Sequence, residues 1–110
     1  MTEDFPAKLP APPYYAVIFT SVRTPDDDAG YDAMAAAMVE RAARQPGFLG
    51  IESARDEAGK GLTVSYWADE QSIKAWKADA EHLVAQKLGR ERWYADFALR
   101  VAKVERAYRF

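Results

Sequence analysis

The sequence predicts one α+β domain of the ferredoxin-like type, with its elements in the order β-α-β-β-α-β. Four segments have the alternating or continuously apolar pattern of strands, and two longer segments between them have helical periodicity. A short connection joins the second and third strands, so these two are expected to form a hairpin. The predicted architecture is therefore a four-stranded antiparallel sheet with two helices on one face.

Residues 1–13 are predicted to form an N-terminal arm. They contain four of the chain's six prolines, and proline cannot donate a hydrogen bond within a central strand. The arm is expected to be extended and to lie over the domain or over a partner. Residues 14–110 are expected to form the domain itself.

The first predicted strand, residues 14–22, is apolar on both of its alternating faces. Tyr15 and Phe19 lie on one face, and Ala16 and Ile18 lie on the other. This pattern is typical of a strand that is covered on both sides.

A helix is predicted from the acidic run at residues 26–28 to about Arg44. Negative charge suits a helix N-terminus, whereas three adjacent aspartates do not converge on one metal ion, so capping is the preferred interpretation. A proline-glycine pair ends this helix. Residues 48–55 and 62–67 then form the two strands of the hairpin.

The stretch Leu62–Tyr94 contains all three tryptophans and the only histidine, His82. It begins with a strand of period two, after which Asp69 or Ser72 caps a helix with an apolar stripe at three- and four-residue steps. The most aromatic part of the chain therefore lies where a strand ends and a helix folds back over the sheet. We expect a pocket at this place.

The last predicted strand, residues 97–108, again has apolar residues on both faces. Two helices cover only one face of a four-stranded sheet, so the apolar residues on the other face need a different cover. In so small a chain a second copy provides it, which predicts a homodimer formed by contact between the open sheet faces.

Composition excludes several classes of function. The net charge of -2 offers no general attraction to nucleic acid or to an anionic membrane. The absence of cysteine excludes disulfides and thiolate metal sites. The first residues lack the pattern of a signal peptide, and no segment has the length of apolar sequence that spans a membrane, so a cytoplasmic protein is expected.

A single histidine also limits the chemistry of any active site. No hydrolytic triad pattern is present, and no second histidine or cysteine accompanies His82 as a zinc ligand, so no metal is predicted. What remains is an aromatic pocket with few polar groups. Its predicted catalytic members are His82 and Trp76, and its predicted substrate-binding members are Tyr15, Phe19, Arg55, Tyr66 and Trp67.

Each of these residues also has a purely structural interpretation. A tryptophan on the inner side of an amphipathic helix, as Trp76 is, commonly belongs to the core. A histidine one position away from the apolar stripe, as His82 is, commonly makes only local hydrogen bonds. The sequence leaves both interpretations open.

The order of elements and two segments resemble the antibiotic biosynthesis monooxygenase-like family of the dimeric α/β-barrel superfamily. The segments are PGFLGIESAR, residues 46–55, and VSYWADEQSIKAWKADAEHLVAQ, residues 64–86, which contains a Trp-x8-Trp element. The resemblance covers residues 14–108 and is closest to an uncharacterised subgroup with a histidine at the position of His82. It implies a ferredoxin-like domain whose sheet pairs with that of a second copy to form a barrel.

The resemblance argues against the haem-degrading branch of this family. Those enzymes have an asparagine on the first strand, where this chain has Phe19 or Thr20. They also have an iron-ligating histidine about ten residues after the tryptophan that matches Trp76, where this chain has Gln86. The resemblance therefore implies no cofactor, with molecular oxygen as co-substrate.

The activity implied is that of a cofactor-independent monooxygenase on a small aromatic or quinol-like substrate. His82 is the candidate base, since it is the one side chain whose ordinary pKa lies near neutrality. Trp76, Trp67 and Tyr15 would hold the ring, and Arg55 or Tyr66 would bind the oxyanion. The alternative is a non-catalytic module of the same fold that binds a small ligand or acts in a stress response.

Overall fold

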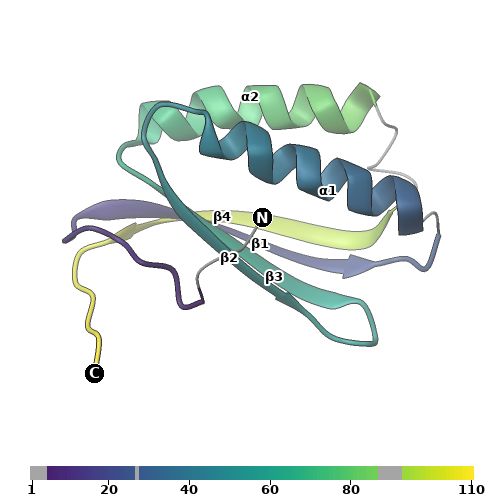
Figure 1. The fold of residues 1–110 in the computed structure, drawn as a ribbon, viewed down its shortest axis with the longest axis horizontal. Helices are drawn as coiled ribbons and strands as arrows, with labels where there is room; N and C mark the ends of the chain where they lie inside the picture. Colours follow the sequence, from purple (N-terminus) through teal and green to yellow (C-terminus); the bar gives the residue numbers. More distant parts are fainter. Residues whose placement is uncertain (1–4, 27, 87–92) are drawn as a thin grey trace.

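The computed structural model describes residues 5–26, 28–86 and 93–110, with side chains at all of these positions except 28 and 81–86. It confirms the predicted β-α-β-β-α-β order (Figure 1). The elements are β1 (Tyr14–Arg23), α1 (Asp28–Ala43), β2 (Phe48–Arg55), β3 (Lys60–Trp67), α2 (Glu70–Gln86) and β4 (Tyr94–Val104).

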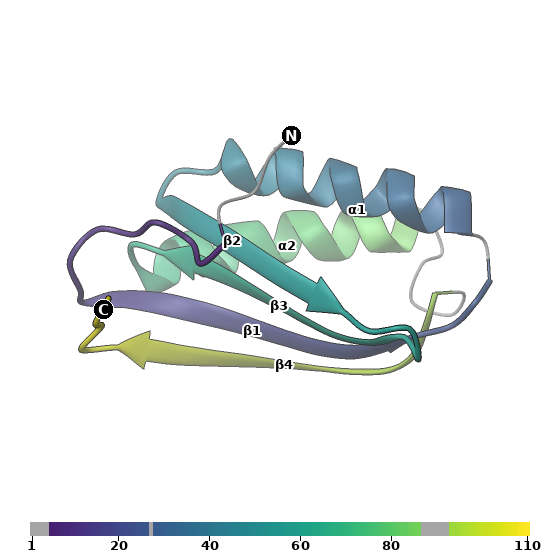
Figure 2. The same ribbon diagram turned by 60° about the horizontal axis from the view of Figure 1, so that its bottom comes forward.

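The four strands form one antiparallel sheet in the order β2-β3-β1-β4, and both helices lie on one face of it (Figures 1 and 2). Side chains alternate between the faces of a sheet, so the pairing register decides which residues lie together. Tyr15 of β1 is opposite Trp67 of β3, and both face the helices. Their neighbours Ala16 and Tyr66, which are also paired, point to the other face, called the open face below.

The hydrophobic core lies between β1, β3 and the helices. Val17, Ala42, Trp67 and Ile73 are its buried members, and Trp67 is 0% exposed. The helix α2 can lie against this layer because Asp69 ends the loop before it: the Asp69 carboxylate accepts a hydrogen bond of 2.8 Å from the backbone N–H of Ser72. Of the two cap residues left open by the sequence, Asp69 is therefore the one used.

The N-terminal arm lies on the open face, against the outer strand β2 (Figure 1). The backbone N–H of Ala7 donates a hydrogen bond of 2.6 Å to the Glu52 carboxylate. Leu9 packs on Gly50, where a Cβ atom would lie 3.0 Å from Leu9 Cδ2. From the C-terminal end, Arg109 donates to the carbonyl of Ala7 at 3.5 Å. The chain itself therefore covers part of the face for which a partner was predicted.

The last strand starts and ends earlier than the predicted range of residues 97–108. A bulge between Val22 and Arg23 brings Tyr94 opposite Arg23, which extends β4 at its start. At the other end Val104 pairs with Tyr14, the first residue of β1. The residue before Tyr14 is a proline, which has no N–H group to continue the ladder. The strand therefore ends at Val104.

Beyond Tyr94, which contacts Tyr31 of α1, the described helix residues leave much of β4 exposed on the helix-facing side. The helix α1 packs on β2 and α2 packs on β3, and Figure 2 shows β4 at the lower edge of the sheet, away from both. Phe97, Leu99 and Val101 face this side, because they pair with residues of β1 that do so, yet they are 38%, 45% and 50% exposed. We call these three residues the apolar strip of β4.

Replacing Trp67 by alanine is expected to lower the free energy of unfolding by about 3–5 kcal/mol, because the change leaves a cavity in the packed layer. Urea denaturation followed by circular dichroism measures the loss. Tyr108→Ala is the control, since Tyr108 is 72% exposed and its removal should change the free energy by less than about 0.5 kcal/mol. Equal losses in the two variants would contradict the central place of Trp67 in the core.

Glu52→Ala is expected to release the N-terminal arm, because it removes the carboxylate that holds Ala7. Cleavage by trypsin after the exposed Lys8 should become faster by about tenfold or more, the effect of losing one charged hydrogen bond on a local opening equilibrium. Glu57→Ala, on the exposed hairpin, serves as the control. Unchanged cleavage in Glu52→Ala would show that the arm is held by other contacts.

Candidate functional site

The structure places five of the predicted site residues in two groups on the helix-facing side of the sheet. The first group contains Tyr15, Trp67 and Trp76, which lie together in the core layer with Phe48. The Trp67 and Trp76 rings are stacked, with centroids 6.0 Å apart and an angle of 23° between their planes. The second group, around Phe19 and Arg55, lies farther along β1 and β2.

The first group is filled by its own side chains. Trp67 is fully buried, and its Nε1–H donates a hydrogen bond of 2.9 Å to the Ser65 hydroxyl. The edge of Phe48 packs on it, with centroids 5.5 Å apart. Tyr15 and Trp76 are only partly buried. In this conformation a ligand can therefore touch Tyr15 and Trp76 but not Trp67.

The second group starts from a row of four residues that crosses the sheet. Arg55 of β2 is opposite Gly61 of β3, Gly61 is opposite Ser21 of β1, and Ser21 is opposite Phe97 of β4. Gly61 has no side chain, so the Arg55 side chain extends over it towards β1. Its Nη2 atom donates a hydrogen bond of 2.7 Å to the buried Ser21 hydroxyl, and Nη1 donates one of 2.5 Å to the carbonyl of Gly59.

Aromatic rings from α1 and β4 lie beside this row. The Tyr31 ring, from the first turns of α1, meets the Tyr94 ring edge-to-face with centroids 5.9 Å apart. The Arg23 guanidinium lies over the Tyr31 ring, 3.9 Å from its centroid, and the Arg55 guanidinium lies 6.0 Å from it. We call Ser21, Arg23, Tyr31, Arg55 and Tyr94 the Arg55 cluster.

The Arg55 cluster continues into the apolar strip of β4. Phe19 contacts both Tyr94 and Phe97, with centroids 5.3 Å and 5.7 Å apart, and Tyr94 also contacts Phe97 at 5.9 Å. A polar group with two guanidinium charges thus borders exposed apolar surface on the same side of the sheet. A ligand with an apolar ring and a polar substituent matches this arrangement.

The environment of Tyr94 keeps its hydroxyl protonated. Burial raises the pKa of Tyr94 well above its usual range, and the hydrogen bond with Tyr31 acts in the same direction. The charges of Arg55 and Arg23 act in the opposite direction without reversing the shift. Tyr94 is therefore a hydrogen-bonding group here rather than a base.

Tyr66 lies away from both groups, on the open face. Its hydroxyl donates a hydrogen bond of 2.6 Å to the same Glu52 carboxylate that holds the arm. Burial and this hydrogen bond raise the pKa of Tyr66 above its usual range. Tyr66 and Arg55 therefore do not meet around one ligand, because the sheet separates them.

His82, the predicted base, is a residue of α2, but its side chain lies outside the part of the chain that the structure describes. Among the described residues, no group of three or more histidine, aspartate or glutamate side chains is arranged to hold a metal ion. Within the same part of the chain, no helix has the length and apolar character needed to cross a membrane.

Sequence reasoning missed several members of the Arg55 cluster. It did not predict Ser21, Arg23, Tyr31 or Tyr94 as site residues. The alternation of β1 already places Ser21 on the same face as Phe19, so this residue could have been found. The position of Tyr94 depends on the bulge at Arg23, which the sequence pattern does not reveal.

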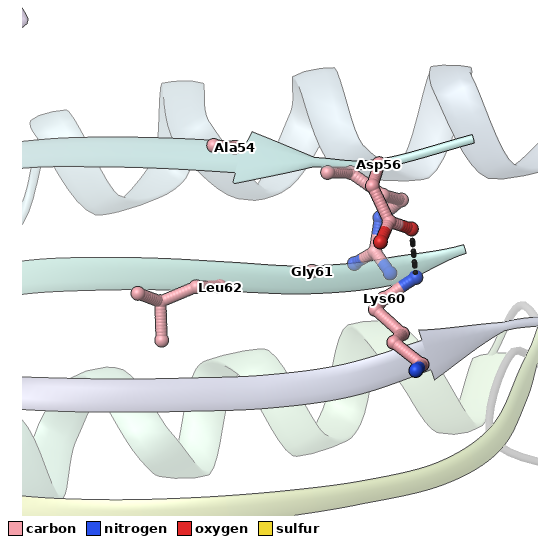
Figure 3. A pocket seen from close by; sticks show the side chains of 6 residues that line it. Ala54, Asp56, Lys60, Gly61 and Leu62 are labelled. Carbon is pink, nitrogen blue, oxygen red and sulfur yellow. Dashed lines mark hydrogen bonds between the residues drawn. The ribbon is translucent and has the colours of Figure 1, made fainter. Parts of the chain in front are cut away.

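The structure also has a shallow surface depression of about 460 Å³ at the end of the β2–β3 hairpin (Figure 3). It is lined by Ala54, Arg55, Asp56, Lys60, Gly61 and Leu62. The Asp56 carboxylate accepts a hydrogen bond of 2.8 Å from the backbone N–H of Lys60, which closes the turn. Ala54 and Leu62 are paired on the open face, so most of this depression lies away from the aromatic groups.

Comparison with known proteins agrees with the fold and identifies the family. The family model described as antibiotic biosynthesis monooxygenase matches residues 13–88. A Bacillus subtilis protein, the uncharacterized protein YqjZ, is 52% identical over 103 residues, which are 94% of this chain and 90% of that protein. The jasmonate monooxygenase ABM of Pyricularia oryzae is 33% identical over 99 residues, which are 86% of this chain but 45% of that protein.

Among solved structures, SnoaB from Streptomyces nogalater, a cofactor-independent oxygenase, has the same fold. It superimposes with a TM-score of 0.69, covers 87% of this chain and 97% of its own, and is 15% identical. The family model spans most of the chain and includes both hairpin strands and α2, where Trp67 and Trp76 lie. The chain therefore belongs to the antibiotic biosynthesis monooxygenase family.

Proposed function

We propose that this protein is a cofactor-independent monooxygenase that acts on a small aromatic or quinol-like substrate. The observation that carries the proposal is the border between the Arg55 cluster and the apolar strip of β4. Phe97 contacts Phe19 and Tyr94 on its inner side and is still 38% exposed. A flat ring that covers Phe97 would bring its oxygen substituent next to Tyr94.

The reaction proposed takes all of its electrons from the substrate. A phenol, or an activated CH₂ group beside a ketone, loses a proton, and the resulting anion reduces oxygen directly. One oxygen atom enters the substrate as a carbonyl group and the other leaves as water, so no flavin or metal is required for the balance. The protein contributes desolvation, orientation and hydrogen bonds to the developing anion.

The described residues support specific parts of this mechanism. The Tyr31–Tyr94 pair and Arg55 supply hydrogen-bond donors for the substrate oxyanion, while Tyr15 and Trp76 have surface left to bind a ring. His82 is retained as the proposed base on the strength of its residue type and its place on α2. Two relatives support the reaction class: SnoaB is a cofactor-independent oxygenase, and the relative from Pyricularia oryzae is a jasmonate monooxygenase.

A non-catalytic module that binds a small ligand is the second candidate. The full burial of Trp67 argues against catalysis within the aromatic layer, because the layer expected to form the catalytic pocket is packed with protein side chains. In both cases we propose a homodimer that forms through the open face. The arm covers β2 on that face, so the second copy would meet the β1–β4 half.

Oxygen consumption by the purified protein tests the proposal. With no added metal or flavin, uptake is measured against anthrones, naphthols and hydroquinones. His82→Ala is expected to lower kcat by about 10²-fold or more, the contribution typical of a general base. Arg44→Gln is the matched control, since Arg44 is exposed, directly follows α1 and pairs with Glu40.

The outcomes separate the two candidates. Uptake that survives in Arg44→Gln and is lost in His82→Ala supports the oxygenase and its base. Uptake equal to the uncatalysed rate with every substrate contradicts the oxygenase and favours the binding module. Uptake that is retained in His82→Ala would keep the oxygenase and reject His82 as the base.

Tyr94→Phe tests the protonation state of the proposed donor. The pKa of Tyr94 is raised on folding, so the folded protein holds this proton more tightly than the unfolded chain does. The associated stability is fully present below the ordinary tyrosine pKa of about 10 and is lost as the pH rises above it. Between pH 8 and pH 11 the wild type should therefore lose more stability than Tyr94→Phe.

Urea denaturation at several pH values measures this difference. The raised pKa of Tyr66 is common to both proteins and cancels in the comparison. Tyr66→Phe, on the open face, provides a second reference. Parallel pH profiles for the wild type and Tyr94→Phe would contradict the burial of a protonated Tyr94.

A further inference from the structure

We propose that the Arg55 cluster is a subsite for a carboxylate, so that the substrate of this protein is an aromatic acid. The inference rests on the proposed function for the place where the ring binds, and it adds the charge of the ligand. Its basis is the unusual position of one arginine, the neutral acceptors around it, and the apolar strip that begins beside it.

The Arg55 side chain can adopt its conformation because the neighbouring residue, Gly61, has no side chain. The strands β2 and β1 are separated by β3, so the Cα atoms of Arg55 and Ser21 are about 10 Å apart. The Arg55 side chain crosses this distance over Gly61, where a Cβ atom would lie 2.6 Å from both Nη1 and Nη2. No side chain fits at position 61 while Arg55 keeps this conformation.

The partners of the Arg55 guanidinium are neutral. It donates to the Ser21 hydroxyl at 2.7 Å, to the carbonyl of Gly59 at 2.5 Å and to the carbonyl of Ser21 at 3.5 Å. Among the described residues, ion pairs join Arg41 to Asp79 and Arg44 to Glu40, and none includes Arg55. The positive charge is thus partly buried and oriented, yet no described carboxylate balances it.

A second guanidinium lies beside the same aromatic ring. Arg23 and Arg55 approach the Tyr31 ring, at 3.9 Å and 6.0 Å from its centroid. The inference depends on Arg55 and not on Arg23. The planar fork of the Arg55 guanidinium matches the geometry of a carboxylate.

The rest of the ligand is defined by the apolar strip. Phe97 lies in the same row as Arg55, and Leu99 and Val101 follow at steps of about 7 Å along β4. This surface has room for one or two fused rings. If Arg55 holds the carboxylate, the Tyr31–Tyr94 pair is left to face the reacting oxygen. The chemistry of the site therefore fits a hydroxylated aromatic acid.

Binding of 2-naphthoate and 2-naphthol, measured by isothermal titration calorimetry at pH 7, tests the inference. The two probes share a ring system and differ in carrying a carboxylate or a neutral hydroxyl. The wild type is expected to bind 2-naphthoate about tenfold or more tightly than 2-naphthol, the effect of one charge-assisted bidentate contact. Arg55→Gln should lose this preference, because its affinity for 2-naphthoate should fall much more than its affinity for 2-naphthol.

Gly61→Ala is the more specific test, because it keeps the positive charge of Arg55 but displaces the guanidinium from its position beside Ser21. Gly61 does not have a positive φ, and the clash involves only the end of a flexible side chain, so the variant should fold. We expect it to lose the preference for 2-naphthoate as Arg55→Gln does. Arg44→Gln, which removes an exposed charge just after the end of α1, should keep the preference. Circular dichroism confirms that each variant is folded.

Equal affinity of the wild type for the two probes, or no binding of either, would overturn the inference. An unchanged preference in folded Arg55→Gln would overturn it as well. The oxygenase proposal is judged separately by oxygen uptake. A preference for 2-naphthoate without oxygen uptake would support the carboxylate subsite and contradict the oxygenase proposal. Oxygen uptake without the preference would support the oxygenase proposal and contradict the carboxylate subsite.

Discussion

The pairing of β1 with both β3 and β4 is the constraint on which the rest of this structure depends. It places Tyr15 opposite Trp67 and, six residues later, Ser21 opposite Gly61 and Phe97. The first pairing builds the packed aromatic layer, and the second builds the row that Arg55 crosses. A shift of one residue in either ladder would turn all of these side chains to the other face. The hydrophobic core and the candidate site thus depend on the same strand register.

Much of the fold could be predicted because it follows from local patterns. The alternation in residues 62–67 assigned Trp67 and Tyr66 to opposite faces, and the structure confirms this. The cap of the second helix was narrowed to two residues, of which Asp69 is the one used. These features depend on neighbours within a few positions, where sequence and structure are most directly related.

The candidate site was harder to predict, because it depends on contacts between distant segments. Arg55 was chosen for its charge, but its conformation is set by Gly61 and Ser21, which only the sheet brings beside it. Trp67 was expected near a ligand, whereas the stacking of Trp76 and the edge of Phe48 enclose it. The open side of β4 follows from how far two helices extend over four strands. No pattern within a short segment of the sequence predicts how much of the sheet the helices cover.

The path of Arg55 over Gly61 also has an evolutionary consequence. Positions 55 and 61 are expected to be inherited together, because the guanidinium reaches β1 only while its neighbour lacks a side chain. A relative with arginine at position 55 and alanine at position 61 would keep the positive charge, but its guanidinium would not reach Ser21 in the same way. Identity at position 55 alone is then a poor guide to shared specificity. If the proposed carboxylate subsite is correct, relatives that bind the same kind of ligand should keep both residues.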